Sequence, residues 1–286
     1  MIRVKHVVLA VLVTPIVLTA GYILWLPWVP ALKTENPKTA AVIERRIEAA
    51  RQKKARHEVR RTWRDLDRIS PNLVHAVLLA EDDTFYRHRG FDFEQIKIAF
   101  KINWKKKRFA YGGSTLTQQL ARTLYLSSKK SLLRKAKEAA IAFWMERSLG
   151  KKRILELYLN FAEWGDGVYG AQAAAQHYYQ KDADELSPEE AVALASILPS
   201  PRKWSPHRVT AFMQRRRGNL MERMAKEGYL TESEREEDRT TLIQELPEQN
   251  GADTEDIEPL ETLTAPSPEG ETPPRQPTES RPGSAQ

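Results

Sequence analysis

One long uncharged stretch limits what the N-terminal part of this chain can become. Residues 7–32 contain no Asp, Glu, Lys or Arg, and about 20 apolar residues are enough to span a bilayer as a helix. Aromatic residues of the kind that favour a membrane interface gather towards its end, namely Tyr22, Trp25 and Trp28. The stretch is longer than a typical signal-peptide core, and no convincing cleavage site follows it. The sequence therefore favours a transmembrane anchor over residues 7–30, behind a short tail of residues 1–6, rather than a cleaved signal peptide.

Charge is distributed unevenly along the chain. The formal net charge is +7 over 286 residues, yet residues 231–286 hold 15 acidic and 4 basic residues, a net of −11, so residues 1–230 carry +18. A body this basic favours a polyanionic partner, such as nucleic acid, anionic lipid or a phosphate-bearing substrate. The chain has no cysteine, which excludes disulfides and thiolate chemistry.

The segments on either side of the central body look non-globular. Residues 231–286 contain 8 of the 17 prolines and no aromatic residue, which predicts a disordered acidic tail that the chemistry does not need. Residues 31–62 are strongly basic, and their apolar stripe of Ile43, Ile47 and Ala50 looks too thin to anchor a core. We expect this segment either to lie along anionic headgroups or to form a solvated stalk.

Residues 63–230 carry the start and stop signals of helices. Ser70-Pro71 is typical of a helix start, and Ser187-Pro188-Glu189-Glu190 has the pattern of a capping box. Gly150 and Gly228 follow helical stretches, where glycine commonly ends a helix. No run of alternating apolar residues is long enough to predict a sheet with confidence. The sequence therefore predicts an all-α domain.

A carboxylate ends one of these helices. Leu73, Val77 and Glu81 fall on one face at spacings of four residues. Burial on this stripe and the negative end of the helix dipole both disfavour the charged form of Glu81, so we expect a raised pKa. A glutamate of this kind can act as a base near neutral pH. The plainer alternative is a helix-ending glutamate that faces water.

Four motifs occur in a fixed order around this glutamate. They are Glu81-Asp82-x-x-Phe85-x-x-His88-x-Gly90, the segment from Gly112 to Arg122 (Gly-Gly-Ser-Thr-Leu-Thr-Gln-Gln-Leu-Ala-Arg), Arg134-Lys-Ala-Lys-Glu138, and Lys151-x-x-Ile-Leu-Glu-x-Tyr-Leu-Asn160. In order and spacing they resemble the peptidoglycan glycosyltransferases, and most closely the monofunctional, membrane-anchored kind. The resemblance covers roughly residues 63 to 205.

The resemblance implies a lysozyme-like helical domain that polymerises lipid II into β-1,4-linked glycan strands and releases undecaprenyl diphosphate. It implies inversion at the anomeric carbon and a place in the bacterial inner membrane, with the catalytic domain on the periplasmic face. The implied partners are lipid II, the growing glycan chain, the membrane bilayer and other cell-wall synthases or division proteins, and not nucleic acid. Residues 93–104, which precede a basic cluster at 105–108, would then form an interfacial membrane helix rather than an ordinary amphipathic one.

The same resemblance assigns roles to individual residues. Glu81 is the expected base. Four cations are expected to face the departing diphosphate, namely Arg122, Lys130, Arg134 and Lys137. Arg122 stands where the family more often has lysine, which keeps the charge and changes the geometry. Hydrogen bonds to phosphate or sugar are expected from Ser114, Thr115, Gln118 and Gln119.

Glu138 is the second expected catalytic carboxylate. It would hold Arg134 or Lys137 in place, or help to bind a Mg²⁺ or other divalent cation that bridges the diphosphate. Asp82 is expected to orient a substrate hydroxyl or a basic side chain. Phe85 is expected to pack, and His88 to hold the loop by a hydrogen bond.

Two other functions compete with this interpretation. A lysozyme-like enzyme that cleaves muramyl glycans would need an acid at the glycosidic oxygen rather than a row of cations. A non-enzymatic basic scaffold would bind anionic polymer without turnover. Ser127-x-x-Lys130 formally matches a transpeptidase motif, but no Lys-Thr-Gly partner follows it, so we expect no cross-linking activity.

Overall fold

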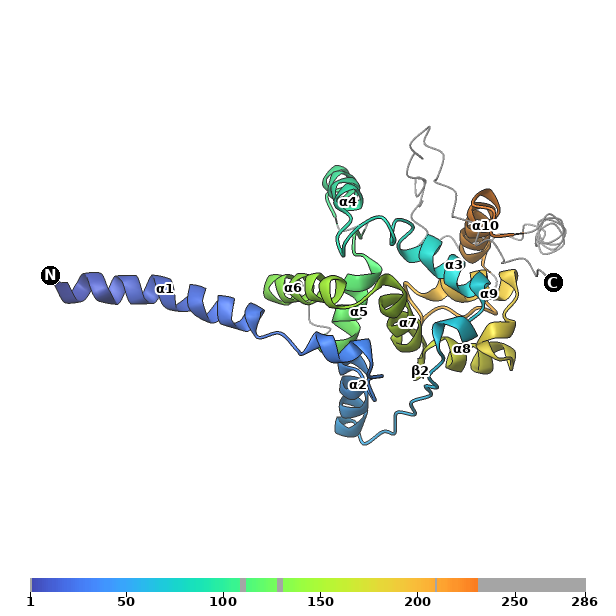
Figure 1. Cartoon of the computed structure of the whole chain (residues 1–286), viewed down its shortest axis with the longest axis horizontal. Helices are drawn as coiled ribbons and strands as arrows, with labels where there is room; N and C mark the ends of the chain where they lie inside the picture. Colours follow the sequence, from blue (N-terminus) through green and yellow to red (C-terminus); the bar gives the residue numbers. More distant parts are fainter. Residues whose placement is uncertain (1, 109–111, 128–130, 209, 231–286) are drawn as a thin grey trace, which may run out of the picture. The chain divides into compact units, whose positions relative to one another are not determined.

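The computed structural model describes residues 2–108, 112–127, 131–208 and 210–230. Nearly all regular structure in these ranges is helical (Figure 1), in agreement with the all-α prediction. Two predictions lie outside the described residues, the acidic tail at 231–286 and the role of Lys130. In chain order the elements are α1 (Ile2–Leu24), η1 (Val29–Lys33), α2 (Ala41–Gln52), η2 (Leu66–Arg68), α3 (Pro71–Glu81), α4 (Phe93–Lys106), α5 (Leu116–Tyr125), α6 (Leu132–Ser148), α7 (Lys151–Phe161), β1 (Glu163–Gly165), β2 (Val168–Tyr169), α8 (Ala171–Tyr179), η3 (Ala183–Glu185), α9 (Pro188–Ile197) and α10 (Ala211–Lys226).

The helix α1 contains Pro15 and continues to Leu24. Across the parts of the chain that the structure describes, no helix combines the length and the apolar character needed to cross a membrane.

The helix α3 forms the centre of one half of the core, where it packs against α9 and α10. Its N-cap is Ser70 and Pro71 occupies its first turn, as the sequence predicts. The Ser70 hydroxyl donates to Leu186 O at 2.8 Å rather than capping its own helix. Leu73 and Val77 are fully buried, so the apolar stripe that leads to Glu81 does face the core.

The helix α5 joins the other half of the core, where it packs against α2, α6 and α7. It begins with a capping box in which the Thr115 side chain accepts from Gln118 N and the Gln118 side chain accepts from Thr115 N. This box satisfies two of the backbone N–H groups that a helix start leaves unpaired.

A short antiparallel hairpin interrupts the helices between α7 and α8. Its strands pair Glu163 with Tyr169 and Gly165 with Val168. The strands have three and two residues, too few to produce the alternating pattern by which a strand is predicted from sequence. The hairpin was therefore not predicted, although Trp164 and Tyr169 are fully buried within it.

The expectation that the basic segment lacks the apolar surface to join a core is wrong for α2. Ile43 is only 3% exposed, and Ile47 packs against the same cluster. Upstream of α2, Val29 and Leu32 are buried as well. A narrow apolar stripe is enough to pack α2 on the core, because α6 and α7 already cover most of α5 and α2 covers only the side of α5 that they leave open. The folded body thus begins well before residue 63.

The helix α4 presents large apolar side chains to the outside. Asp92 caps its start, and its side chain accepts from Gln95 N at 2.8 Å. Phe93, Phe100 and Trp104 are 74%, 66% and 76% exposed. Lys105 and Lys106 occupy its last turn, so the apolar side chains lie beside basic ones, as the sequence predicts.

Candidate active site

Glu81 is the last residue of α3, and its carboxylate lies against α5. Gln119 Nε2 donates to Glu81 Oε2 at 2.9 Å. Burial raises the pKa of Glu81, while the hydrogen bond from Gln119 and the charges of Arg216 and Arg122 partly oppose the rise. Glu81 is therefore a carboxylate that accepts a proton more readily than an ordinary glutamate, which agrees with the prediction made from its position.

Tyr158 on α7 fixes the orientation of Gln119. Its hydroxyl donates to Gln119 Oε1 at 3.3 Å, which leaves the amide N–H₂ of Gln119 directed at Glu81. Burial and the nearby Glu81 charge raise the pKa of Tyr158 well above its usual value. Tyr158 consequently stays neutral and keeps its donor proton at any physiological pH.

The loop after Glu81 is held by hydrogen bonds among the residues of its own motif. His88 Nε2 lies 2.8 Å from Asp82 Oδ1, and both side chains are almost completely buried. Gly90 N donates to His88 Nδ1 at 3.2 Å. Because Nδ1 accepts, Nε2 carries the proton and donates to Asp82. This confirms the expected loop-holding role of His88, and Phe85, 1% exposed, packs in the core as predicted.

Asp82 also ties this loop to the start of α5. Its second oxygen, Oδ2, accepts from Leu116 N at 2.8 Å, and Thr115 Oγ1 donates to Gly90 O at 2.8 Å. Asp82, Thr115 and Gln118 are all buried and hold the scaffold behind Glu81. The site residues that remain accessible from this part of the chain are Ser114, Gln119 and Arg122.

Glu138 forms the centre of a second cluster, on α6. Its side chain is 0% exposed, and its two oxygens accept from Arg134 Nη1 and Lys135 Nζ, each at 2.5 Å. Lys135 Nζ also donates to Ser114 Oγ at 2.9 Å. A buried carboxylate with two cationic partners is stable only as a complete group, so Glu138 fixes Arg134 and Lys135 in place.

A continuous chain of contacts connects the two glutamates. Gln119 Nε2, which donates to Glu81, also lies 3.5 Å from Ser114 O. The Ser114 hydroxyl in turn accepts from Lys135, the partner of Glu138. The loop residue Ser114 therefore stands between a carboxylate able to act as base and a pair of fixed cations.

Arg134 retains donor capacity towards a ligand. Its Nε is buried and makes no hydrogen bond with any residue that the structure describes, while Nη1 is held by Glu138. An orphaned N–H on a guanidinium is costly to bury. The Arg134 side chain is nevertheless 14% exposed, and a phosphate oxygen that approached its accessible edge would suit the planar fork of an arginine.

Glu138 does not fit the role of a direct metal ligand. Both of its oxygens already accept short hydrogen bonds from cations, and a Mg²⁺ ion would compete with these cations and be repelled by them. Within the described ranges, no group of three His, Asp or Glu side chains could hold a metal ion.

The remaining predicted residues have other positions. The side chain of Lys137 is directed elsewhere: its Nζ lies 4.3 Å from the ring centre of Tyr22 in α1, and the ion pairs of Glu138 are with Arg134 and Lys135. The expectation that Glu138 holds Arg134 is confirmed, whereas its alternative partner, Lys137, is replaced by Lys135. Arg122 is exposed on α5 and acts on Glu81 through its charge.

Sequence reasoning missed three residues of this site. Lys135 lies within a recognised motif, and its spacing of three residues from Glu138 was a usable signal. Tyr158 also lies in a quoted motif, but only the packing of α7 on α5 shows that it contacts Gln119. Arg216 lies on α10, far along the chain, and is partly buried, with Nε donating to Ser196 O at 3.0 Å. No local pattern could have placed Arg216 beside Glu81.

Comparison with known proteins agrees with this site. A family model described as Transglycosylase matches residues 48–225. The chain is 43% identical over 190 residues to a biosynthetic peptidoglycan transglycosylase of Nitrosospira multiformis, which covers 66% of this chain and 83% of the relative. Proteins of the same name from Alcanivorax borkumensis and Azoarcus sp. are 44% and 43% identical, covering 73% and 69% of this chain and 83% and 89% of the relatives. The family match includes both glutamate clusters and Arg216 of α10, and the chain belongs to the transglycosylase family.

Proposed function

We propose that this protein is a peptidoglycan transglycosylase that polymerises lipid II into β-1,4-linked glycan strands. The observation that carries the proposal is the chain of contacts from Glu81 through Gln119 and Ser114 to Lys135 and Glu138. It joins a base with a raised pKa to fixed cations, and a glycosyl transfer to a sugar hydroxyl with a diphosphate leaving group needs both.

In the proposed reaction, Glu81 accepts the proton of the acceptor 4-hydroxyl as its oxygen attacks C1 of the donor sugar. The new O4–C1 bond forms while the bond between C1 and the diphosphate oxygen breaks, and the electron pair of that bond leaves on the diphosphate. Arg134 and Lys135, both held by Glu138, stabilise the charge that develops there. A single displacement inverts C1, because no second carboxylate acts as a nucleophile.

The cations also favour transfer over glycan cleavage. A glycosidase of the lysozyme type needs a protonated acid at the glycosidic oxygen, and cations alone do not supply one. The second carboxylate here, Glu138, is 0% exposed and bound by Arg134 and Lys135. The pair of carboxylates that such a glycosidase uses is thus not present in this cluster, and it is the fixed cations, not the raised pKa of Glu81, that favour transfer. The alternative of a non-enzymatic scaffold that binds anionic polymer does not account for a buried glutamate of raised pKa.

For the membrane, we propose that the part of the uncharged stretch 7–30 that precedes η1 anchors the protein and that the catalytic domain faces the periplasm. Val29, at the end of that stretch, belongs to the folded body instead. The exposed Phe100 and Trp104 of α4, next to the lysines of its last turn, suit contact with a headgroup region. We further propose a lysozyme-like domain, with other cell-wall synthases and division proteins as partners.

For the divalent cation, we propose that Mg²⁺ arrives bound to the substrate diphosphate and not on a preformed protein site. The engagement of both Glu138 oxygens supports this order of binding. A bound cation of this kind would neutralise part of the leaving-group charge. Lys130 and Lys137 are proposed to add positive charge along the same path.

The decisive experiment compares the detergent-purified protein with its Glu81→Gln variant on labelled lipid II in the presence of Mg²⁺. We expect long glycan strands from the wild type alone, because Gln cannot accept the hydroxyl proton. The variant should melt at the same or a higher temperature at pH 8, because it removes a buried carboxylate whose folded-state pKa is raised. Wild-type turnover by Glu81→Gln, or cleavage of preformed glycan, would overturn the proposal.

A further inference from the structure

The C-terminal end of α3 carries the proposed base and is held from outside by an arginine of α10. Arg223 Nη1 donates to Leu79 O at 2.7 Å, and Arg223 Nη2 donates to Asp83 Oδ2 at 2.9 Å. Leu79 and Asp83 lie two residues before and two residues after Glu81. The two hydrogen bonds therefore bracket the base from either side along the chain.

The bond to Leu79 meets a need of the helix itself. The last four carbonyl groups of an α-helix have no partner within it, and Leu79 O is one of these at the end of α3. Leu78 O accepts from Asp82 N. The helix ends at Glu81, so Asp83 N is not in position to donate to Leu79 O. Arg223 supplies the missing donor and places a positive charge at the negative end of the helix dipole.

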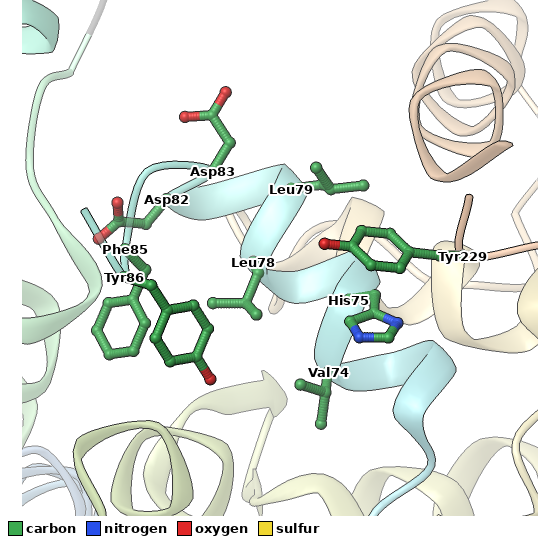
Figure 2. Close-up of a pocket in the computed structure, with 9 residues that line it drawn as sticks. All are labelled: Val74, His75, Leu78, Leu79, Asp82, Asp83, Phe85, Tyr86 and Tyr229. Atoms are coloured by element: carbon green, nitrogen blue, oxygen red, sulfur yellow. The ribbon is translucent and has the colours of Figure 1, made fainter. Parts of the chain in front are cut away.

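Apolar packing alone does not support this end of α3. A cavity of about 130 Å³ lies beside the last two turns, between the helix and the turn that carries Tyr229 (Figure 2). Leu78, Leu79 and Asp83 line the cavity, and Tyr229 stacks on His75 at its rim, with ring centres 3.8 Å apart. The side of the helix end that faces this open pocket has fewer packing neighbours than a fully covered side would have, so the polar contacts of Arg223 add to the fixing of its position.

Asp82 and Asp83 attach the loop after Glu81 to two different parts of the structure. Figure 2 shows their carboxylates pointing in different directions from the end of α3. Asp82 binds inward to Leu116 N and His88, whereas Asp83 binds outward to Arg223. Glu81, directly before this pair, is thereby fixed relative to both α5 and α10.

We propose that Arg223 is a positioning residue for Glu81, which acts by locking the C-terminal turn of α3 through Leu79 and Asp83. The inference rests on the proposed function of Glu81 as the base. Its effect is geometric: the charges that lower the pKa of Glu81 come from Arg216 and Arg122. A base displaced by about 1 Å can react about 100-fold more slowly, while substrate binding at the cation cluster of α6 is left intact.

The test uses Arg223→Gln and Arg223→Lys in the full-length protein, with Arg215→Gln as a matched control. Arg215 is an exposed arginine of the same helix, and its variant should behave as wild type. We expect Arg223→Gln to lower kcat about 10- to 100-fold with KM nearly unchanged, and the acidic limb of its pH profile to stay in place. Arg223→Lys keeps the charge but loses the fork, so it should recover only part of kcat.

Hydrogen exchange supplies a second measurement that does not depend on catalysis. The backbone amides of residues 80–85 should exchange faster in Arg223→Gln than in the wild type or Arg215→Gln. If the wild type makes no glycan, the proposed function fails, while the exchange data still test the lock. If the wild type is active and Arg223→Gln is folded with unchanged kcat and exchange, the positioning role is overturned. A shifted acidic limb would likewise overturn it in favour of an electrostatic role.

Discussion

At the scale of single residues, the most important property of the site is the pKa of Glu81, on which burial and the neighbouring side chains have opposite effects. Burial raises the pKa of Glu81, whereas Gln119, Arg216 and Arg122 lower it. Stronger pairing with cations would lower the pKa of this carboxylate and weaken it as a base, whereas loss of the cations would raise its pKa further. The net result is a raised pKa of Glu81 that Gln119, Arg216 and Arg122 hold below what burial alone would produce.

Replacing Arg216 should shift this balance in a predictable direction. A base works only when it is deprotonated, so activity falls as the pH drops through its pKa, which here lies above the usual value of about 4.3 for glutamate. Arg216→Gln removes a charge that lowers this pKa. We therefore expect the acidic limb of kcat/KM to move to higher pH, as measured by polymerisation rates across a pH series. A limb that stays in place or moves to lower pH would contradict the assignment, and Arg215→Gln is the control.

At the scale of helices, the site depends on how each helix begins and ends. The base stands at the end of α3, and the loop that faces it runs into the capped start of α5. The capping box at Thr115 and the proline start at Pro71 follow from local sequence patterns and could be predicted. The contacts between ends could not, because Asp82 with Leu116 N and Arg223 with Leu79 O join residues 34 and 144 positions apart.

The cap of α5 should therefore contribute more stability than an ordinary surface cap. Thr115→Ala removes both the bond to Gln118 N and the bond to Gly90 O, and we expect a loss of about 1–2 kcal/mol in the free energy of unfolding. Ser131→Ala, at the exposed start of α6, removes one bond to Arg134 N and should cost about 0.5–1 kcal/mol. Urea unfolding of the two variants measures the difference. Equal losses would mean that the bond to Gly90 contributes nothing.

At the scale of the whole molecule, the order of the sequence motifs predicted the site better than the spacing of apolar residues predicted the limits of the folded domain. Four short motifs indicated which residues share a site, and the structure joins all four in one network. Gln119 and Ser114 of the second motif link Glu81 of the first to the cations around Glu138 in the third, and Tyr158 of the fourth donates to Gln119. The limits of the folded body were harder to predict. The apolar stripe of α2 is judged thin when α2 is considered alone, but burial of Ile43 depends on the surface that α5 offers, and that surface exists only in the folded state.

Packing of α2 on the core can be tested through Ile43. Ile43→Ala should lower the free energy of unfolding by about 2–4 kcal/mol, because it leaves a cavity at a position that is 3% exposed. Glu44→Ala, at an exposed neighbouring position, should change it by less than about 0.5 kcal/mol. Chemical denaturation of both variants is the measurement. A stalk that lies apart from the domain would tolerate both changes equally.

Because η1 is buried, it limits how many N-terminal residues can be removed from the protein without exposing its core. Val29 is 0% exposed, Leu32 is 5% exposed, and Arg153 of α7 donates to Leu32 O at 2.7 Å. A fragment designed to omit the N-terminal helix for ligand screening should therefore begin just before Val29. A fragment that begins at residue 63 would lack α2 and so uncover one side of α5, the helix that presents Gln119 to the base, and we expect inhibitors selected on it to bind the full protein less well.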